Sequence, residues 1–456
     1  MVKLFAVADD LTGANATGAL LTLQGLRVAT LRPEGLGKLP ALSGYDAVIV
    51  SSNSRALPAD EAYARVRACF SSFARMAGEG ASHFSKRIDT TLRGNVAVEI
   101  DAALDELTDA ELAVVVPAFP KSGRITVGGY QLVDGVPLEK TSVARDPRTP
   151  VSQSHVPTLI QDGTRRKVAS IPLGDVLRGS ERVLERLSEA RSSGAKIVVV
   201  DAATDDEIDV IASAVSRLPF QVLLVDPGAF TASVVLASRE VAPPTDVTPV
   251  SGPVRGQGRV ALVVVGSATP LTRAQIKRLA ETLPTVTVPV NARALAVGDP
   301  LSFDSVVAQA TAKVLDAISA RGPQDVAIIV TSSSSQEDTL DLASLDREMD
   351  RAAGTAATNL ASGLGRIART ALESSRGAVC GLYVTGGDTT LAVLEEVGAA
   401  GIEINTEVLP LAASGTLIGG RHEGLRLVTK GGLVGGEDAA VRCVRHLLEH
   451  GGESRE

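Results

Sequence analysis

Two acids near the N-terminus stand where catalytic chemistry would need them. In the stretch VADDLTGAN, an apolar run ends at Asp9 and Asp10, and Thr12 opens the next polar turn. A helix N-cap favoured by the helix dipole explains one acid, but not two acids followed by Thr-Gly. A carboxylate here could accept a proton from a substrate hydroxyl, or hold a metal together with nucleotide phosphates. Asp10, or else Asp9, is therefore predicted to be the base or the group that positions a water.

A second stretch, SKRIDTTLRGN, gathers cations and hydroxyls just past a predicted strand. Arg and Lys together can grip a carboxylate, Arg in bidentate fashion. Asp89, Thr90 and Asn95 can bond to hydroxyl groups. The alternative is a salt-bridged loop in which Asp89 pairs with Arg87 or Arg93, a kind of surface pair that contributes little to stability. Together the two stretches favour one small, anionic, hydroxylated ligand, its carboxylate held by Arg93, Lys86 or Arg55.

A third polar stretch, SSNSRALP, follows another predicted strand and offers Asn53, Ser54 and Arg55 at the same rim. A surface loop that caps a helix explains it equally well. The predicted residues for the anionic ligand are Asp10, Thr12, Asn53, Ser54, Arg55, Lys86, Asp89, Thr90, Arg93, Gly94 and Asn95.

Three turns in the C-terminal half each place glycine or hydroxyl groups directly after a predicted strand: VVVGSATP, YVTGGDTT and VTKGGLVGG. Glycine lets backbone N–H groups approach a phosphate, and a helix N-terminus adds a favourable dipole. Tight turns or a flexible cap are the alternatives, and neither a Walker A motif nor a dinucleotide fingerprint is present. The combination predicts a nucleotide site formed by Gly266, Ser267, Gly386, Gly387, Asp388, Thr389, Lys430, Gly431, Gly432 and Gly435.

Strands and helices alternate along the chain. Apolar runs predict strands at 3–8, 46–50, 111–116, 195–200, 220–225, 259–265, 325–330, 379–384 and 424–429. Helices are predicted at 59–77, 95–107, 179–192, 204–217, 270–282, 302–319, 352–374, 388–398 and 436–449. RITVGGYQLVDGVPL predicts a hairpin that turns at Gly128-Gly129 or Asp134-Gly135. Alternation of this kind is typical of parallel sheets.

The predicted fold class is α/β, with two domains, each a mainly parallel sheet flanked by helices, and an active-site cleft between them. The Pro- and Gly-rich segment 244–258 predicts an extended linker. It separates an N-terminal domain, 1–243, from a C-terminal domain, 259–456.

Composition excludes several classes of protein. The chain has 456 residues, 45% of them hydrophobic, and a formal net charge of −8, which argues against a general nucleic-acid binder. Three distant cysteines indicate neither a zinc site nor a disulfide scaffold, and no metal-ligating set of side chains is predicted. No apolar run approaches a membrane span, and the N-terminus does not read as a signal peptide. We expect a cytoplasmic protein without nucleic-acid or membrane partners; a homodimer is possible.

The motifs resemble those of the four-carbon acid sugar kinases, once known only as a domain of unknown function. The resemblance rests on VADDLTGAN, SKRIDTTLRGNVAVEI, VVPAFPKSGRITVGGYQLVDGVPLEKT with RDPRTPV, GSATPLTRAQI, VTGGDTT and VTKGGLVGGEDA, in family order. It implies a sugar-acid-binding N-terminal domain, a nucleotide-binding C-terminal domain, and ATP-dependent phosphorylation of the terminal hydroxyl of threonate, erythronate or 3-oxo-tetronate. Matching positions assign Asp10, Ser54, Arg55, Lys86, Asp89 and Arg93 to the acid sugar, and Ser267, Gly386 to Thr389 and Gly431-Gly432 to ATP.

The resulting hypothesis is a small-molecule kinase that uses ATP and Mg²⁺, with Asp10, Asp9 and Arg93 as its catalytic residues. Two alternatives stay open. The first is a regulatory protein that binds a sugar acid or a nucleotide without turnover, because GGLVGG and LPLAASGTL depart from the family pattern. The second is a nicotinamide-dependent oxidoreductase, although the GxGxxG fingerprint is missing.

Overall fold

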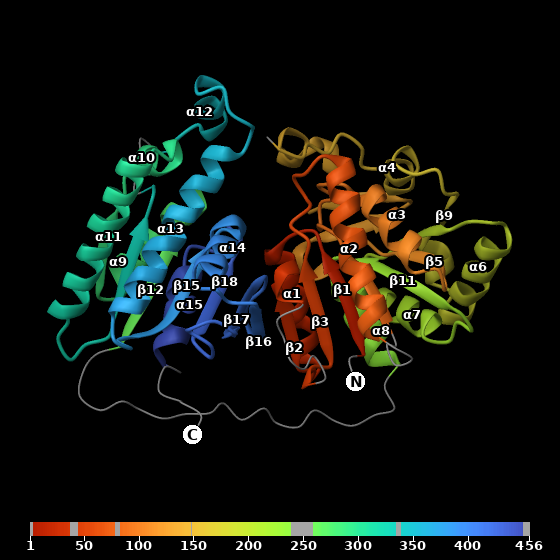
Figure 1. Ribbon diagram of the computed structural model, residues 1–456. Coiled ribbons are helices and arrows are strands. Elements are labelled where there is room, and N and C mark those ends of the chain that lie inside the picture. The colour runs from red at the N-terminus through yellow and green to blue at the C-terminus, as the bar shows by residue number, and fades with distance from the viewer. Residues whose placement is uncertain are drawn as a thin grey trace. The chain divides into compact units, whose positions relative to one another are not determined.

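The computed structural model describes residues 3–36, 44–77, 83–146, 148–238, 259–333 and 339–449. The chain divides into two compact units, Met1–Thr245 and Asp246–Glu456 (Figure 1). The predicted linker at 244–258 lies outside the described residues. Over the described part of the chain, no helix is both long enough and apolar enough to cross a membrane.

The first unit is built on one parallel sheet. Its strands are β1 (Leu4–Ala8), β2 (Val28–Leu31), β3 (Ala47–Ser51), β4 (His83–Arg87), β5 (Ala110–Val115), β9 (Val168–Ile171), β10 (Ile197–Val200) and β11 (Gln221–Asp226). They lie in the order β2-β3-β1-β4-β11-β5-β10-β9, and neighbouring strands pair in parallel. In this register Ala8 lies opposite Ser51 on one side and Arg87 on the other. The central strands therefore end level, at one edge of the sheet.

Helices cover both faces of this sheet. They are α1 (Leu11–Leu23), α2 (Ala59–Ala77), α3 (Val96–Glu106), α4 (Val156–Asp162), α5 (Leu173–Val176), α6 (Ser180–Ser192), α7 (Asp205–Val215) and α8 (Ala229–Ala237). On β4, Ser85 bonds to Thr231 of α8, whereas the adjacent Lys86 bonds to Glu99 of α3. Since successive strand residues point to opposite faces, α8 and its neighbour α1 cover one face, while α3 and its neighbour α2 cover the other.

A small antiparallel sheet interrupts the alternation. Its strands are β6 (Arg124–Val127), β7 (Tyr130–Val133) and β8 (Val136–Pro137). The predicted hairpin is confirmed, and the chain turns at both candidate positions, where Gly128, Gly129, Asp134 and Gly135 all have positive φ. Two residues with positive φ match the turns that suit two-residue hairpins. Asp201, which follows β10, accepts the N–H groups of Gly128 and Gly129 and fixes this sheet to the main one.

The second unit repeats the architecture. Its strands are β12 (Val260–Val265), β13 (Thr285–Pro289), β14 (Val326–Thr331), β15 (Val379–Thr385), β16 (Gly401–Leu409), β17 (Ala412–Ile418) and β18 (Arg426–Lys430), in the order β13-β14-β12-β15-β18-β17-β16. The first five strands of this order, β13-β14-β12-β15-β18, pair in parallel with their neighbours. β17 pairs antiparallel with β18 and with β16. Both units thus match the predicted α/β class with mainly parallel sheets.

The helices of the second unit also lie on two faces. They are α9 (Pro270–Thr282), α10 (Ala292–Val297), α11 (Pro300–Ala320), α12 (Leu342–Glu348), α13 (Thr355–Ser374), α14 (Gly387–Glu396) and α15 (Ala439–Glu449). Leu279 of α9 and the apolar side of α15 share one core with Val263 and Tyr383. α14 packs on α13, which packs on α10 and α11. Because β12 crosses to β13 in one direction and β14 crosses to β15 in the other, right-handed connections place α9 and α13 on opposite faces.

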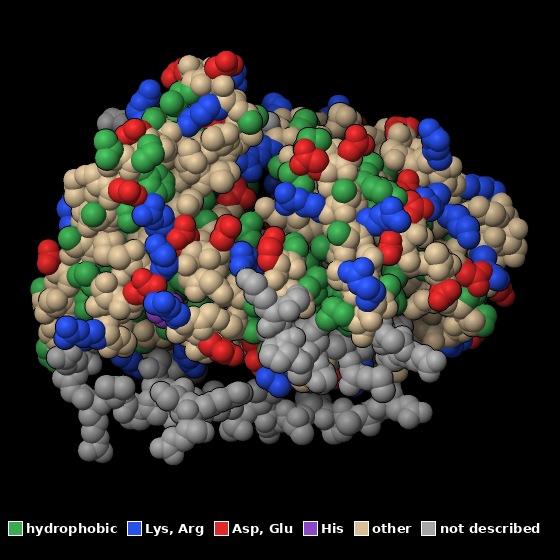
Figure 2. Space-filling model, in the orientation of Figure 1, with side chains coloured by type: hydrophobic (Ala, Val, Ile, Leu, Met, Phe, Trp, Pro, Cys, Tyr) green, Lys and Arg blue, Asp and Glu red, His purple; other side chains and the backbone are tan. Residues whose placement is uncertain are grey.

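Charged side chains are interspersed over the described surface. On the face shown in Figure 2, Lys and Arg alternate with Asp and Glu over both units, and no broad basic patch is visible there. This distribution agrees with the balanced charge pattern of the sequence.

Candidate active site

In the first unit, β1 lies between β3 and β4, and the connection after β1 runs to the opposite face of the sheet from the connections after β3 and β4. β1 leads into α1 on one face, while β3 and β4 lead into α2 and α3 on the other. Ligands of open α/β sheets bind at such a switch point, beyond the carboxyl ends of the strands. The residues that follow these three strands supply Asp9, Asp10, Arg55 and Asp89.

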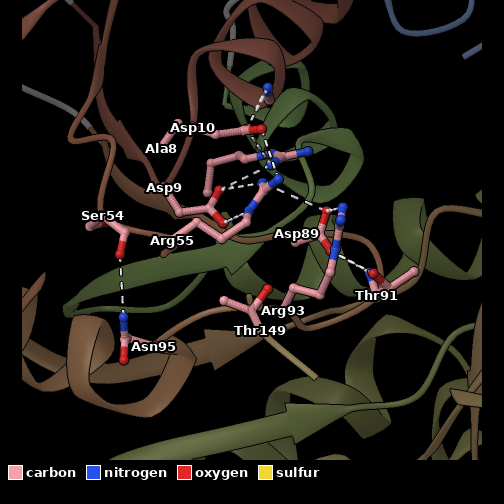
Figure 3. Close-up of polar contacts among 12 residues, drawn as sticks. Ala8, Asp9, Asp10, Ser54, Arg55, Asp89, Thr91, Arg93, Asn95 and Thr149 are labelled. Carbon is pink, nitrogen blue, oxygen red and sulfur yellow. Dashed lines mark hydrogen bonds and ion pairs between the residues drawn. The ribbon is translucent and has the colours of Figure 1, made fainter. Parts of the chain in front are cut away.

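Asp9 is buried and fully engaged. Its Oδ2 accepts from Arg55 Nε at 2.6 Å, and its Oδ1 accepts from Arg55 Nη2 at 3.0 Å and from Arg87 Nη1 at 3.1 Å. Burial raises the pKa of Asp9, but the charges of Arg55 and Arg87 outweigh burial, so its pKa lies below the ordinary value. Asp9 is thus a fixed anion that orients two arginines (Figure 3).

Asp10 is the more accessible of the two acids. It is the N-cap of α1, where its Oδ1 accepts the N–H of Gly13 at 2.8 Å, and its Oδ2 pairs with Arg55 Nη1 at 2.8 Å. Its side chain is 21% exposed, against 3% for Asp9. Arg87 Nη1 approaches Oδ1 at 3.4 Å. Asp10 therefore combines a fixed orientation with access to solvent, which a group that orients a substrate hydroxyl needs.

Arg87 reaches the two acids only because residue 13 is glycine. A Cβ on Gly13 would lie 2.0 Å from Arg87 Nη1 and 2.2 Å from Cζ. The guanidinium therefore lies directly on the first turn of α1. Arg87 is not among the site residues predicted from the sequence. The only signal for it was Gly13 in DDLTG, which indicates that another group approaches the first turn of the helix closely.

Asp89 and Arg93 form the other half of the cluster. Arg93 Nε donates to Asp89 Oδ2 at 2.8 Å and Nη2 to Oδ1 at 3.2 Å, while Nη1 reaches Asp146 Oδ2 at 3.4 Å. Burial raises the pKa of Asp89, but Arg55 and Arg93 more than reverse this, and the pKa falls well below its ordinary value. The Arg93 side chain is 28% exposed, against 17% for Arg55 and 5% for Arg87. Arg93 is the most accessible arginine of the cluster.

Lys86 and Ser54 do not lie where the sequence interpretation put them. Lys86 belongs to β4 rather than to a loop beyond it, and its side chain is fully buried against α3. Its Nζ pairs with Glu99 Oε2 at 2.7 Å and donates to the Arg87 carbonyl at 2.7 Å. Ser54 is also fully buried, and its Oγ donates to Glu99 Oε1 at 2.5 Å. Both side chains lie beneath the cluster, where a ligand cannot contact them.

The remaining predicted residues of this unit shape its loops. Asn53 has φ +49°, and Gly94 has φ +92° and packs against Arg55, which a Cβ would approach to 3.1 Å. Asn95 Nδ2 donates to the Leu57 carbonyl at 2.9 Å and to that of Ser54 at 3.3 Å, so it holds the loop after β3. Thr12 lies half-buried in the first turn of α1.

In the second unit, the chain leaves the adjacent strands β12 and β15 toward α9 and α14 on opposite faces. Val265 lies opposite Thr385, so the two strands end level. Gly266 N–H donates to the Thr385 carbonyl at 3.2 Å, and a Cβ on Gly266 would lie 1.8 Å from Thr389 Oγ1. Gly386 has φ +111°, and its N–H donates to the Lys430 carbonyl at 2.9 Å. Three predicted turns therefore meet at a second switch point.

Hydroxyl groups join the first and third of these turns. Ser267 Oγ lies 2.9 Å from Thr272 Oγ1, and both Thr269 and Thr272 donate to the Gly432 carbonyl at 3.0 Å. A Cβ on Gly432 would lie 2.2 Å from Ser267 Oγ. Ser267 thus packs on the glycine loop, and its side chain is engaged there in this structure.

Comparison with known proteins agrees with this arrangement. Residues 4–234 match the model of a sugar-binding N-terminal domain, and residues 262–440 match that of a nucleotide-binding C-terminal domain. The chain is 42% identical over 448 residues, 98% of both chains, to a protein of Heliobacterium modesticaldum named D-erythronate kinase. It is 30% identical over 434 residues, 94% of both chains, to a protein of Salmonella typhimurium named D-threonate kinase. The chain belongs to the four-carbon acid sugar kinase family.

A solved structure extends this family relationship to the fold. A Salmonella typhimurium LT2 protein, provisionally called a tRNA synthase, superimposes with a TM-score of 0.78 over 98% of this chain and 100% of its own, at 22% identity. At that identity the likeness shows the fold alone.

In this acid sugar kinase, Lys430 ends β18 directly before the glycine loop. Its side chain is 1% exposed, and its Nζ donates to the Gly431 carbonyl at 2.8 Å. Burial lowers the pKa of Lys430 to about 8. Beside it, Gly387 and the exposed Asp388 open α14 next to the buried Thr389, and Gly435 has φ +76°. A buried ammonium that donates to a backbone carbonyl suits an anionic ligand.

Two further residues of the acid sugar kinase's first unit escaped sequence reasoning as individual candidates. Asp146 caps its own loop by accepting the N–H of Thr149 at 2.9 Å, and it reaches Arg93. Gln131 of β7 donates to the Thr90 carbonyl at 3.0 Å and to that of Pro117 at 3.1 Å, and so holds the loop of Asp89. RDPRTPV and GGYQLV contain these residues, and those stretches were the available signal.

Proposed function

We propose that the protein is an ATP-dependent kinase that phosphorylates the terminal hydroxyl of a four-carbon acid sugar, with D-erythronate as the first candidate. The relative named D-erythronate kinase matches 98% of both chains at 42% identity, against 30% for the D-threonate kinase of Salmonella typhimurium. The observation that supports the assignment of roles is that one cluster at the β1 switch point contains two partly exposed groups of opposite charge, Arg93 at 28% and Asp10 at 21% exposure.

Arg93 is proposed to hold the carboxylate of the acid. Arg55 is shared by Asp9, Asp10 and Asp89, so its guanidinium is committed to the protein. Arg93 donates from Nε and Nη2 to Asp89, at 2.8 and 3.2 Å. Its third hydrogen bond, from Nη1 to Asp146, is the longest at 3.4 Å. A ligand carboxylate would replace that contact most readily. Bidentate pairing of arginine with a carboxylate supplies both affinity and orientation.

Asp10 is proposed to orient the hydroxyl that is phosphorylated and to accept its proton. The oxygens of both acids contact arginines, but the Asp10 side chain is 21% exposed and that of Asp9 only 3%. Phosphoryl transfer needs only modest basicity, because catalysis depends mainly on positioning and on stabilisation of charge. Arg55 and Arg87 hold Asp10 in place, which makes them positioning residues.

The second unit is proposed to bind ATP, with residues 259–456 as the nucleotide domain and 1–243 as the acid domain. The glycine turns at 266, 386 and 431–432, the N-terminus of α14 and the ammonium of Lys430 would hold the phosphates. Among the described residues, no group of three or more His, Cys, Asp or Glu side chains could hold a metal. Mg²⁺ would therefore be held largely by the phosphates, whose charge it offsets. The predicted cleft between the domains stays a prediction.

A screen for ADP release tests the proposal. The protein is mixed with ATP, Mg²⁺ and, separately, D-erythronate, D-threonate and 3-oxo-tetronate. We expect release with at least one acid, and a kcat for Asp10→Asn reduced by about 100-fold or more. Asp60→Asn, on the exposed side of α2, is the matched control and should keep wild-type activity. Binding of the acids without ADP release would instead support a protein that binds without turnover, and binding of NADH but not ATP would support an oxidoreductase.

A further inference from the structure

A chain of buried polar groups runs directly beneath the acid and arginine cluster. Lys86 Nζ pairs with Glu99 Oε2 at 2.7 Å, and Glu99 Oε1 accepts from Ser54 Oγ at 2.5 Å. Ser54 Oγ lies 2.8 Å from Ser52 Oγ, which donates to the Ala8 carbonyl at 2.8 Å. At its other end, Lys86 Nζ donates to the Arg87 carbonyl at 2.7 Å. We call Lys86, Glu99, Ser54 and Ser52 the buried network.

The buried network connects the carboxyl ends of three strands. Ala8 ends β1, Ser52 and Ser54 follow β3, and Arg87 ends β4. At two of these points the next residue belongs to the cluster, since Asp9 follows Ala8 and Arg55 follows Ser54. At the third point Arg87 is itself a member of the cluster. A shift of any one strand end by a fraction of an ångström would therefore move an acid relative to its arginine.

Burial shows that the network has no direct contact with a ligand. The side chains of Lys86, Ser52 and Ser54 are fully buried, and Glu99 is 1% exposed. Burial raises the pKa of Glu99 against the opposing effect of Lys86, which shows how unfavourable the site is for an isolated charge. Buried ion pairs of this kind seldom stabilise a fold more than well-packed apolar side chains of the same volume. Stability alone does not account for the network.

We propose that the buried network positions the catalytic acids by fixing where β1, β3 and β4 end relative to one another along the strand direction. This inference rests on the proposed kinase function and adds to it residues that contact neither substrate nor nucleotide. Because the network supports Asp9, Asp10 and Arg55 but has no contact with Arg93, it should affect kcat more than the KM for the acid. Misplacement of a reacting group by about 1 Å can cost about 100-fold in rate.

Two variants test the proposal by different routes. Lys86→Met with Glu99→Leu replaces the ion pair by apolar side chains of similar length, so no buried charge is left unpaired. Ser54→Ala keeps the ion pair and removes only its link to the loop after β3. We expect the double variant to lower kcat about 10- to 100-fold, and Ser54→Ala to lower it several-fold. The KM values for acid and ATP should change less than about threefold, and the melting temperature should stay near that of the wild type.

Arg166→Met is the matched control. It breaks an ion pair with Asp101, which lies on α3 two residues after Glu99 but away from the strand ends. Its kinetic constants should equal those of the wild type. If the double variant and Ser54→Ala both keep wild-type kcat, the positioning role is wrong while the kinase assignment stands. If the double variant unfolds, the kcat of Ser54→Ala decides the matter. A wild-type protein without kinase activity on any four-carbon acid would remove the proposed function itself.

Discussion

The arginines that contact Asp9, Asp10 and Asp89 differ in how many of their N–H groups the protein already uses. Arg55 bonds to three aspartates, and Arg87 joins Asp9 to Asp10 while lying on Gly13. Arg93 is the most exposed and keeps its weakest contact on the side of Asp146. Arg55 and Arg87 thus position the aspartates, whereas Arg93 has N–H groups that a ligand could reach.

Replacement of Arg93 by lysine separates charge from geometry. Lysine keeps the positive charge but loses the planar fork, so Arg93→Lys should raise the KM for the acid by about 10-fold or more. The affinity for ATP, measured by calorimetry, should be unchanged, because Arg93 belongs to the first unit. Arg67→Lys on the exposed pair with Glu106 is the control and should behave like the wild type. A normal KM for the acid together with weakened ATP binding would show that the roles of the two units are assigned wrongly.

If Lys430 binds the phosphates as proposed, nucleotide binding should be sensitive to pH. Burial lowers its pKa to about 8, so the ammonium that would meet the phosphates is lost as pH rises above that value. ATP affinity should therefore fall between pH 8 and 9.5, by up to about tenfold per pH unit. In the protein without ligand the unfolded state binds more protons in this range, so stability should rise from about pH 8 toward the ordinary lysine pKa.

Calorimetric titration with ATP at several pH values measures this effect. Lys430→Arg keeps its charge throughout and should show a nearly flat pH dependence above pH 8. The same slope in the wild type and in this variant would mean that Lys430 is not the titrating group.

Sequence reasoning grouped the residues of the acid and arginine cluster better than it located the buried side chains beneath them. Asp9, Asp10, Arg55, Asp89 and Arg93 do come together. Lys86 was misplaced because neighbouring residues of a strand point to opposite faces, and the end of the strand could not be located to one residue. Once β4 is known to end at position 87, the alternation sends Lys86 toward α3 and its neighbour toward α1.

At the scale of elements, α9 anchors the glycine loop of the second unit. Gln275 is buried, and its Nε2 donates to the carbonyls of Val434 and Gly436 at 2.9 Å each. Together with Thr269 and Thr272, it fixes the path of a loop that glycine would otherwise leave free. The exposed Leu433 lies at the centre of this loop.

Gln275→Leu should therefore weaken the nucleotide side alone. The substitution keeps the size of the side chain and removes both hydrogen bonds, so we expect the KM for ATP to rise about threefold to tenfold while the KM for the acid stays constant. Gln309→Leu, on the exposed side of α11, is the control. An equal rise in both KM values would indicate a general loss of structure rather than a misplaced loop.

Most of the parallel strands could be predicted, because buried parallel strands are continuous apolar runs. β1, β3, β12, β14 and β15 were expected within about one residue of their observed bounds. Among the strands that were missed, β2 (VATL) is buried and parallel but only four residues long, whereas two others lack that pattern. β13 (TVTVP) ends its sheet and is partly exposed, and β16 (GIEINTEVL) alternates polar with apolar residues in an antiparallel pair.

At the scale of the whole molecule, both units contribute to the family relationship. The match to the protein named D-erythronate kinase spans 98% of both chains, and each unit matches one of the two domain models of the family. Each unit places its candidate ligand groups where a parallel sheet changes the direction of its connections. Under the proposed function, the carboxylate and the phosphates are recognised by different units, so we expect substitutions in one unit to leave binding by the other unchanged.

Identification of the product tests the central claim most directly. The wild-type protein is incubated with ATP, Mg²⁺ and each four-carbon acid that releases ADP, and the product is isolated for ³¹P and ¹³C NMR. We predict a monophosphate ester on the terminal carbon of the acid, formed in a one-to-one ratio with ADP. A phosphate on the carboxylate or on an internal hydroxyl, or ADP formed without any phosphorylated acid, would contradict it.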